Sequence, residues 1–143
     1  MKYRSIIAIT LGLAIVVFAA ACGGTGTSTT AGMKPVTEKK VNDNLTVVLS
    51  NPEGKLKNGE QELLLSFKDG SGKPVEINAA VLNFKMPAMG SMSEMNDPAV
   101  LTTTSTPGEF KGKVNLQMAG EWQAQISYEG KETGKMTMTV TAY

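Results

Sequence analysis

The side chains of this sequence most able to do chemistry are thioethers. Four methionines recur at intervals of three residues in the middle of the chain, at Met86, Met89, Met92 and Met95. A thioether is neutral, polarisable and soft, so it binds Cu(I) and similar soft ions while discriminating against Mg²⁺, Ca²⁺ and largely Zn²⁺. The residue type and the spacing together predict a Cu(I) site.

Two residues within this stretch indicate that it is a loop rather than a helix. Pro87 fixes φ and lacks a backbone donor, and Gly90 favours irregular backbone. A loop could fold several sulfur atoms around one ion. Glu94 and Asp97 lie in the same polar segment, and we expect both carboxylates to be solvated rather than to act as ligands.

Two alternatives to metal binding stay open for the four methionines. In one, Met86 and Met89 plug the open end of the fold as core residues. In the other, the segment is a soft hydrophobic surface that contacts a protein or membrane partner. Three further methionines, Met118, Met136 and Met138, alternate with polar residues and are expected to be core residues.

Trp122 is the only tryptophan of the chain and begins an alternating segment. This position predicts a core indole. An alternative role is that of a cation–π cap on Cu(I), which requires the ring to lie within about 6 Å of the ion.

Composition argues against an enzyme and against nucleic-acid binding. The chain has no histidine and one cysteine, so the usual general base and an open zinc site are both missing. The formal net charge is +1. Since no basic run is present, nucleic acid is not an expected partner.

The first residues have the layout of a secretory signal. Lys2 and Arg4 precede an apolar run, which ends in small residues before Cys22. This ending resembles the lipobox of bacterial lipoproteins, although Ala19 stands where leucine is preferred. We therefore expect a signal peptide over 1–21, lipidation of Cys22, and a flexible linker over 22–41, which is rich in Gly, Thr and Ser at its start. An ordinary signal cleaved near residue 21 is the alternative.

Residues 42–143 are long enough for one domain with a hydrophobic core. Apolar residues alternate with polar ones in seven segments, near 45–49, 63–67, 75–84, 100–106, 110–118, 122–128 and 136–142. Turn residues such as Asn51-Pro52-Glu53-Gly54 and Pro107-Gly108 separate them. This pattern predicts an all-β fold, an antiparallel immunoglobulin-like β-sandwich of about seven strands.

Three short motifs carry a resemblance to a known family. They are the methionine segment 86–92, Pro107-Gly108-Glu109-Phe110, and Ala119-Gly120-Glu121-Trp122. In order and spacing the region from about residue 41 to 143 resembles the YtkA-like domain, a FixH-related family of secreted or membrane-attached bacterial β-sandwiches. The resemblance implies a setting near copper-handling and heavy-metal efflux proteins.

These observations predict a non-catalytic protein on the extracytoplasmic face of a bacterial membrane, anchored through lipid at Cys22. It would bind Cu(I) through some of the four methionines and buffer the ion or hand it to a copper-handling protein. The rival hypothesis is an interaction module without metal, whose methionine loop contacts a protein or membrane partner.

Overall fold

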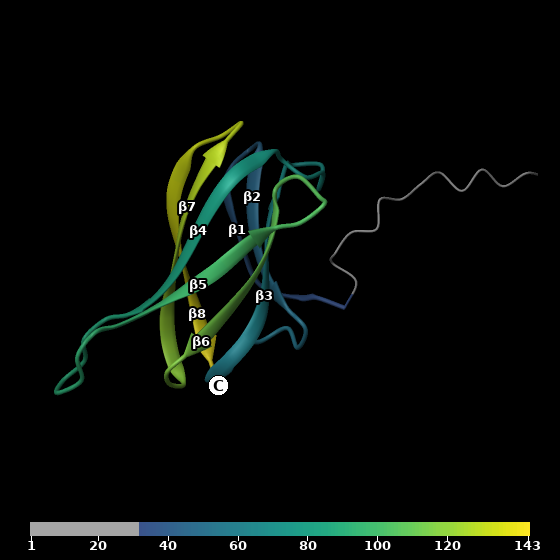
Figure 1. Ribbon diagram of the computed structural model, residues 1–143. Helices are drawn as coiled ribbons and strands as arrows, with labels where there is room; N and C mark the ends of the chain where they lie inside the picture. The colour runs from purple at the N-terminus through teal and green to yellow at the C-terminus, as the bar shows by residue number, and fades with distance from the viewer. Residues whose placement is uncertain (1–31) are drawn as a thin grey trace, which may run out of the picture.

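The computed structural model describes residues 32–143, which form eight β-strands (Figure 1). The strands are β1 (Lys34–Asn42), β2 (Leu45–Asn51), β3 (Gly59–Lys68), β4 (Ile77–Met86), β5 (Met95–Thr103), β6 (Glu109–Leu116), β7 (Gly120–Gly130) and β8 (Gly134–Ala142). Seven of them correspond to the segments in which apolar and polar residues alternate. The all-β prediction is confirmed, because this alternation places one face of each strand in the core.

Every neighbouring pair of strands is antiparallel, and the order is β1-β2-β3-β6-β5-β4-β7-β8 in one sheet. β5 joins the two halves because its first part pairs with β4, from Met95 to Ala99, and its second part pairs with β6, from Val100 to Thr103. Figure 1 shows β5 crossing obliquely between them. Residues 32–143 thus form eight antiparallel strands, one more than the predicted seven, in one curled, barrel-like sheet, and the immunoglobulin-like sandwich stays a prediction.

The two ends of the sheet, β1 and β8, approach each other through side-chain and loop contacts. The Lys39 ammonium on β1 donates to the carbonyl of Thr137 on β8 at 2.9 Å. Beyond β8, the backbone N–H of Tyr143 donates to Leu56 O at 3.0 Å, and Asn58 N–H donates to Tyr143 O at 3.1 Å. The connection between β2 and β3 thus pairs with the end of β8 and helps to close the sheet.

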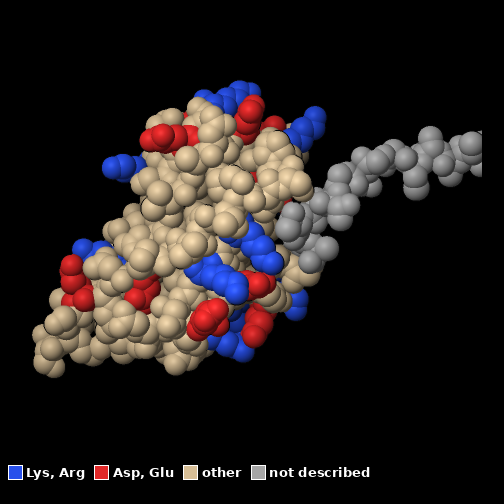
Figure 2. All heavy atoms as spheres, viewed as in Figure 1, with Lys and Arg blue, Asp and Glu red and all other residues tan. Residues whose placement is uncertain are grey.

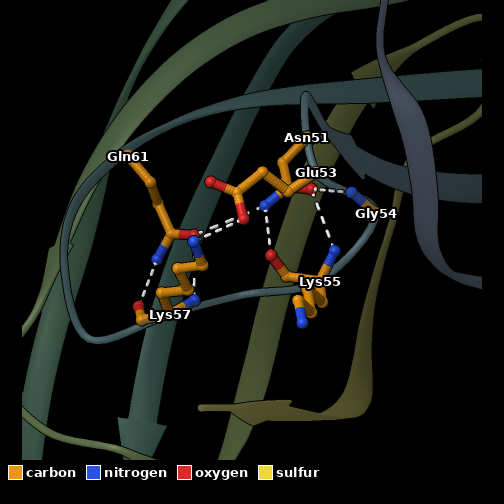
Figure 3. A network of polar contacts seen from close by, with 6 residues as sticks. All are labelled: Asn51, Glu53, Gly54, Lys55, Lys57 and Gln61. Atoms are coloured by element: carbon orange, nitrogen blue, oxygen red, sulfur yellow. Dashed lines mark hydrogen bonds and ion pairs between the residues drawn. The ribbon is translucent and has the colours of Figure 1, made fainter.

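A polar network organises this connection (Figure 3). The Asn51 side chain accepts hydrogen bonds from Gly54 N–H at 2.6 Å and Lys55 N–H at 3.1 Å, and it donates to Lys55 O at 2.6 Å. Gln61 similarly joins both backbone groups of Lys57. This irregular segment lacks regular backbone pairing. The two side chains supply hydrogen-bond partners for its backbone N–H and C=O groups instead.

β1 lies where the sequence predicts flexible linker. The strand begins at Lys34, so residues 34–41 belong to the folded domain rather than to the linker, and the domain begins before residue 42. Most of its residues are exposed, and the strand carries three lysines and one glutamate in place of apolar alternation. Charged, exposed residues are typical of an edge strand, which explains why alternation does not reveal it.

The core lies inside the curled sheet. Trp122, Phe67 and Phe84 are its largest fully buried side chains. The ring of Phe67 packs edge-on against Phe110 with centroids 6.1 Å apart and tilts against Tyr128 at 5.2 Å. Such offset aromatic contacts add to the stabilisation from buried area.

The predicted signal peptide, the lipidation site at Cys22 and most of the predicted linker lie outside the described residues. Within residues 32–143 there is no helix long and apolar enough to cross a membrane.

Candidate functional site, the methionine hairpin

The four methionines at intervals of three form two cross-strand pairs on one hairpin, residues 86–95, which we call the methionine hairpin. Met86 at the end of β4 is the direct partner of Met95 at the start of β5. Nearer the tip, Met89 N–H donates to Met92 O at 3.1 Å and Met92 N–H donates to Met89 O at 2.9 Å. The hairpin therefore has a base pair, Met86 and Met95, and a tip pair, Met89 and Met92.

The turn between the tip residues is short because Gly90 follows Met89 with a positive φ of 58°. Glycine adopts this conformation without the steric cost that a side chain brings, so it permits a two-residue reversal. The hairpin projects beyond the body of the domain, as the teal and green extension of β4 and β5 in Figure 1. The segment is thus a hairpin whose base belongs to the sheet, rather than an irregular loop.

The two pairs differ in exposure. Met89 is 57% exposed and Met92 is 39% exposed, whereas Met86 is only 2% exposed. Met95 is partly buried and packs against the core cluster. The tip pair is therefore open to an ion in solution, while the base pair is embedded at the end of the core.

The tip carries no charged side chain. Residues 86–93 contain no Lys, Arg, Asp or Glu, and the projecting end is entirely tan in Figure 2. Elsewhere on that face, acidic and basic side chains are interspersed. A soft, uncharged donor set at the tip is suited to a soft monovalent cation, and residues 86–93 offer none of the carboxylates that Mg²⁺ and Ca²⁺ sites use.

The two nearby carboxylates have structural partners. Glu94 forms an ion pair with Lys85 at 3.1 Å, which spans the two strands of the hairpin. Asp97 is only 6% exposed, so the expectation that it is solvated is wrong. Its carboxylate accepts hydrogen bonds from Gln117 N–H at 3.0 Å and from the Gln117 side-chain amide at 2.6 Å, and so links β5 to the residue that follows β6.

Trp122 is fully buried beside the base of the hairpin. Its indole N–H donates to Met118 O at 3.1 Å. Met118 lies in the turn between β6 and β7 and is only partly buried, packed against the core cluster. The alternation of apolar and polar residues predicts that Met118 ends a strand, and it does not indicate that Met118 lies in a turn at the same end of the sheet as the methionine hairpin. The turn-forming residues Ala119 and Gly120 were the sequence feature that could have indicated this.

The described residues contain no group of three or more His, Cys, Asp and Glu side chains that could hold a metal ion. Within residues 32–143, the soft donor atoms that lie in a cluster are thus the sulfur atoms of methionines. Met136 and Met138 are on β8, and Met138 is buried in the core as predicted.

Comparison with known proteins places the chain in a family. The sequence model of the YtkA-like family matches residues 38–127, and the chain belongs to that family. This region extends from β1 to within β7 and includes the methionine hairpin. No curated protein and no solved structure matches the chain significantly.

Proposed function

We propose that this protein binds Cu(I), or Ag(I) as its mimic, through the methionine hairpin, and that it buffers the ion or delivers it to a copper-handling protein. It would do so on the extracytoplasmic face of a bacterial membrane, anchored by lipid at Cys22. The observation that carries the proposal is the tip pair. Two exposed thioethers lie directly opposite each other across a turn that their own backbone hydrogen bonds close.

The backbone pairing prepares the tip for an ion. The α-carbons of a hydrogen-bonded cross-strand pair are about 5.5 Å apart, which is within reach of two flexible thioethers that converge on one ion. Because the turn is already formed, binding orders only the side chains, and less conformational entropy is lost than in an unstructured methionine segment.

Thioether ligands also suit the proposed compartment. Unlike a thiolate, a thioether needs no deprotonation before it binds, so affinity does not depend on a ligand pKa. A methionine cannot form a disulfide in an oxidising environment. Its vulnerability is oxidation to the sulfoxide, which replaces the soft donor with a polar group.

Competition with a Cu(I) chelator under reducing conditions tests the proposal. All measurements use the chain with Cys22→Ser, without a histidine tag, because the Cys22 thiolate would itself bind copper. We expect the parent to compete for Cu(I) and to ignore Zn²⁺. Met89→Leu with Met92→Leu should weaken Cu(I) binding at least about tenfold, equivalent to about 1.4 kcal/mol.

The matched control is Met136→Leu with Met138→Leu on β8, which removes two thioethers far along the sequence from the hairpin. This variant should keep its Cu(I) affinity, since leucine conserves the hydrophobic volume. Failure of the parent to bind Cu(I), or equal affinity in the tip variant and the parent, would refute metal binding at the tip.

The exposure of Met89 and Met92 also favours a second candidate, a metal-free interaction module. An uncharged, flexible methionine tip can adapt to an apolar surface of a protein or membrane partner. In that case the Met89→Leu and Met92→Leu variant would retain partner binding, because leucine preserves the apolar area. Loss of function in this variant, without restoration by excess partner, would argue for thioether chemistry instead.

A further inference from the structure

The base of the methionine hairpin brings together thioethers from two separate connections of the sheet. Met86 and Met95 are direct cross-strand partners, and such residues have Cβ atoms about 4.5–5.5 Å apart on the same face. Met118 comes from the β6–β7 turn and packs, like Met95, against the core cluster that includes Met86 and Trp122. Only Met86 of the three is fully buried, so the other two form the solvent-facing side of the group.

The strand register places the indole beside this group. The pairing of β4 with β7 reaches Lys85 and Gln123, and the next position in that register would set Met86 against Trp122. Both side chains face the core and are buried. The row Met95, Met86, Trp122 thus crosses three adjacent strands on the inner face of the sheet.

Two local contacts bring the β6–β7 turn to this row. Asp97 on β5 receives two hydrogen bonds from Gln117, the residue before Met118, which ties the turn to the strand that carries Met95. The indole N–H of Trp122 holds the Met118 carbonyl at 3.1 Å. The chain at Met118 is therefore held to β5 through the preceding residue, Gln117, and to β7 through the Met118 carbonyl.

Gly120 leaves room for the Met86 thioether. A Cβ atom at position 120 would lie 3.0 Å from the Met86 methyl carbon, closer than ordinary contact. The absence of that atom allows the end of the Met86 side chain to lie against the β6–β7 turn. The turn, the base pair and the indole consequently meet at one end of the core.

We propose that Met86, Met95 and Met118 form a second soft-metal site, shielded by Trp122 and distinct from the exposed tip pair. The proposal extends the proposed function, since it assumes that thioethers of this domain bind Cu(I) or Ag(I). An ion enters past the partly exposed Met95 and Met118. The three neutral sulfur atoms would hold the ion, and the indole would provide the electron-rich surface that favours a nearby cation.

Titration with Ag(I) tests this site because Trp122 is the only tryptophan and its emission reports on this end of the core alone. In the Cys22→Ser background, the parent should bind two equivalents of Ag(I), and one of them should change the tryptophan emission. Met89→Leu with Met92→Leu should bind one equivalent and keep the emission change. Met118→Leu should bind one equivalent and lose that change.

Met136→Leu is the matched control, since it replaces a similarly half-buried thioether on β8, and it should behave as the parent. Circular dichroism confirms that each variant is folded. An unchanged emission response in Met118→Leu, or loss of the response in the tip variant, would overturn the second site. The latter result would indicate one site shared by both pairs.

The two proposals fail in different ways. A parent that binds no Ag(I) overturns both of them. A different result overturns only the shielded site: the parent binds one equivalent of Ag(I), the tip variant binds none, and the tryptophan emission does not change in either protein. The proposed function would then remain supported.

Discussion

At the residue scale, methionines of identical chemistry occupy different environments, because their burial differs. Met86 ends β4 inside the core, whereas Met89, three residues later, is more than half exposed. The sulfur of the first is reached only through the end of the core, and that of the second is open to solvent. Spacing in the sequence does not distinguish them, since burial depends on where the hairpin leaves the sheet.

This difference predicts unequal effects on stability. Met86→Ala should lower the free energy of unfolding by about 2–5 kcal/mol, because it removes buried volume and leaves a cavity. Met89→Ala, on the exposed tip, should change it by less than about 0.5 kcal/mol. Urea unfolding of both variants measures the comparison. A large loss of stability for Met89→Ala would mean that the tip residue plugs the core.

At the element scale, turns in this domain are held by single polar side chains that bond several backbone groups. Asp69 in the β3–β4 connection accepts from Ser71 N–H at 2.8 Å, the Ser71 hydroxyl at 2.6 Å and Lys73 N–H at 3.0 Å. Asn51 has the same role between β2 and β3. Such side chains define the chain reversals that allow neighbouring strands to pair.

The Asp69 turn should make a pH-dependent contribution to stability. Hydrogen bonds from the Ser71 hydroxyl and then from the Lys73 and Ser71 amides hold the pKa of Asp69 below its ordinary value of 3.8. A lowered pKa in the folded state means that the contribution is present above pH 3.8 and is lost as pH falls through the lower, folded-state pKa.

Comparison of the parent with Asp69→Asn at several pH values measures this effect. The parent should be the more stable protein near pH 6, and the difference should shrink below pH 3.8, where the Asp69 carboxylate becomes protonated. A difference that stays constant down to pH 2 would show that the charge of Asp69 does not stabilise the turn.

At the scale of the whole molecule, one curled sheet presents a projecting hairpin at one end. β5 changes partner along its length, and the segment around Leu56 pairs with the end of β8. These two connections join what would otherwise be separate layers. The arrangement keeps a compact core while the methionine tip extends from it.

The proposed anchor predicts the behaviour of the whole protein in cells. Cys22→Ser should leave the domain folded but move the protein out of the membrane fraction, because two acyl chains provide stable attachment at about 0.8 kcal/mol per buried methylene. Fractionation and mass spectrometry of the parent and variant test this. A parent without acyl mass, or a variant that stays in the membrane, would rule out lipid anchoring at Cys22.

The sequence by itself determined seven of the eight strands and the side-chain types of the candidate site. Seven strands follow from alternation, because the side chains of a strand point to opposite faces and only one face is buried. The thioether side chains of the candidate site follow from residue type alone. The resemblance to the YtkA-like family that the short motifs carry is confirmed, since the family model matches residues 38–127.

Only the tertiary structure decided which elements meet. The alternation of apolar and polar residues indicates which face of a strand is buried but not which strand lies beside it. The single sheet and the change of partner along β5 could therefore not be predicted from the sequence. The exposed edge strand β1 carries no such alternation. Asp97 is buried and bonded to Gln117, and Gly120 lies against the Met86 methyl group, because long-range pairing brings β5 and the β6–β7 turn together. The division of four evenly spaced methionines into a tip pair and a base pair has the same cause, since cross-strand register sets which side chains face each other.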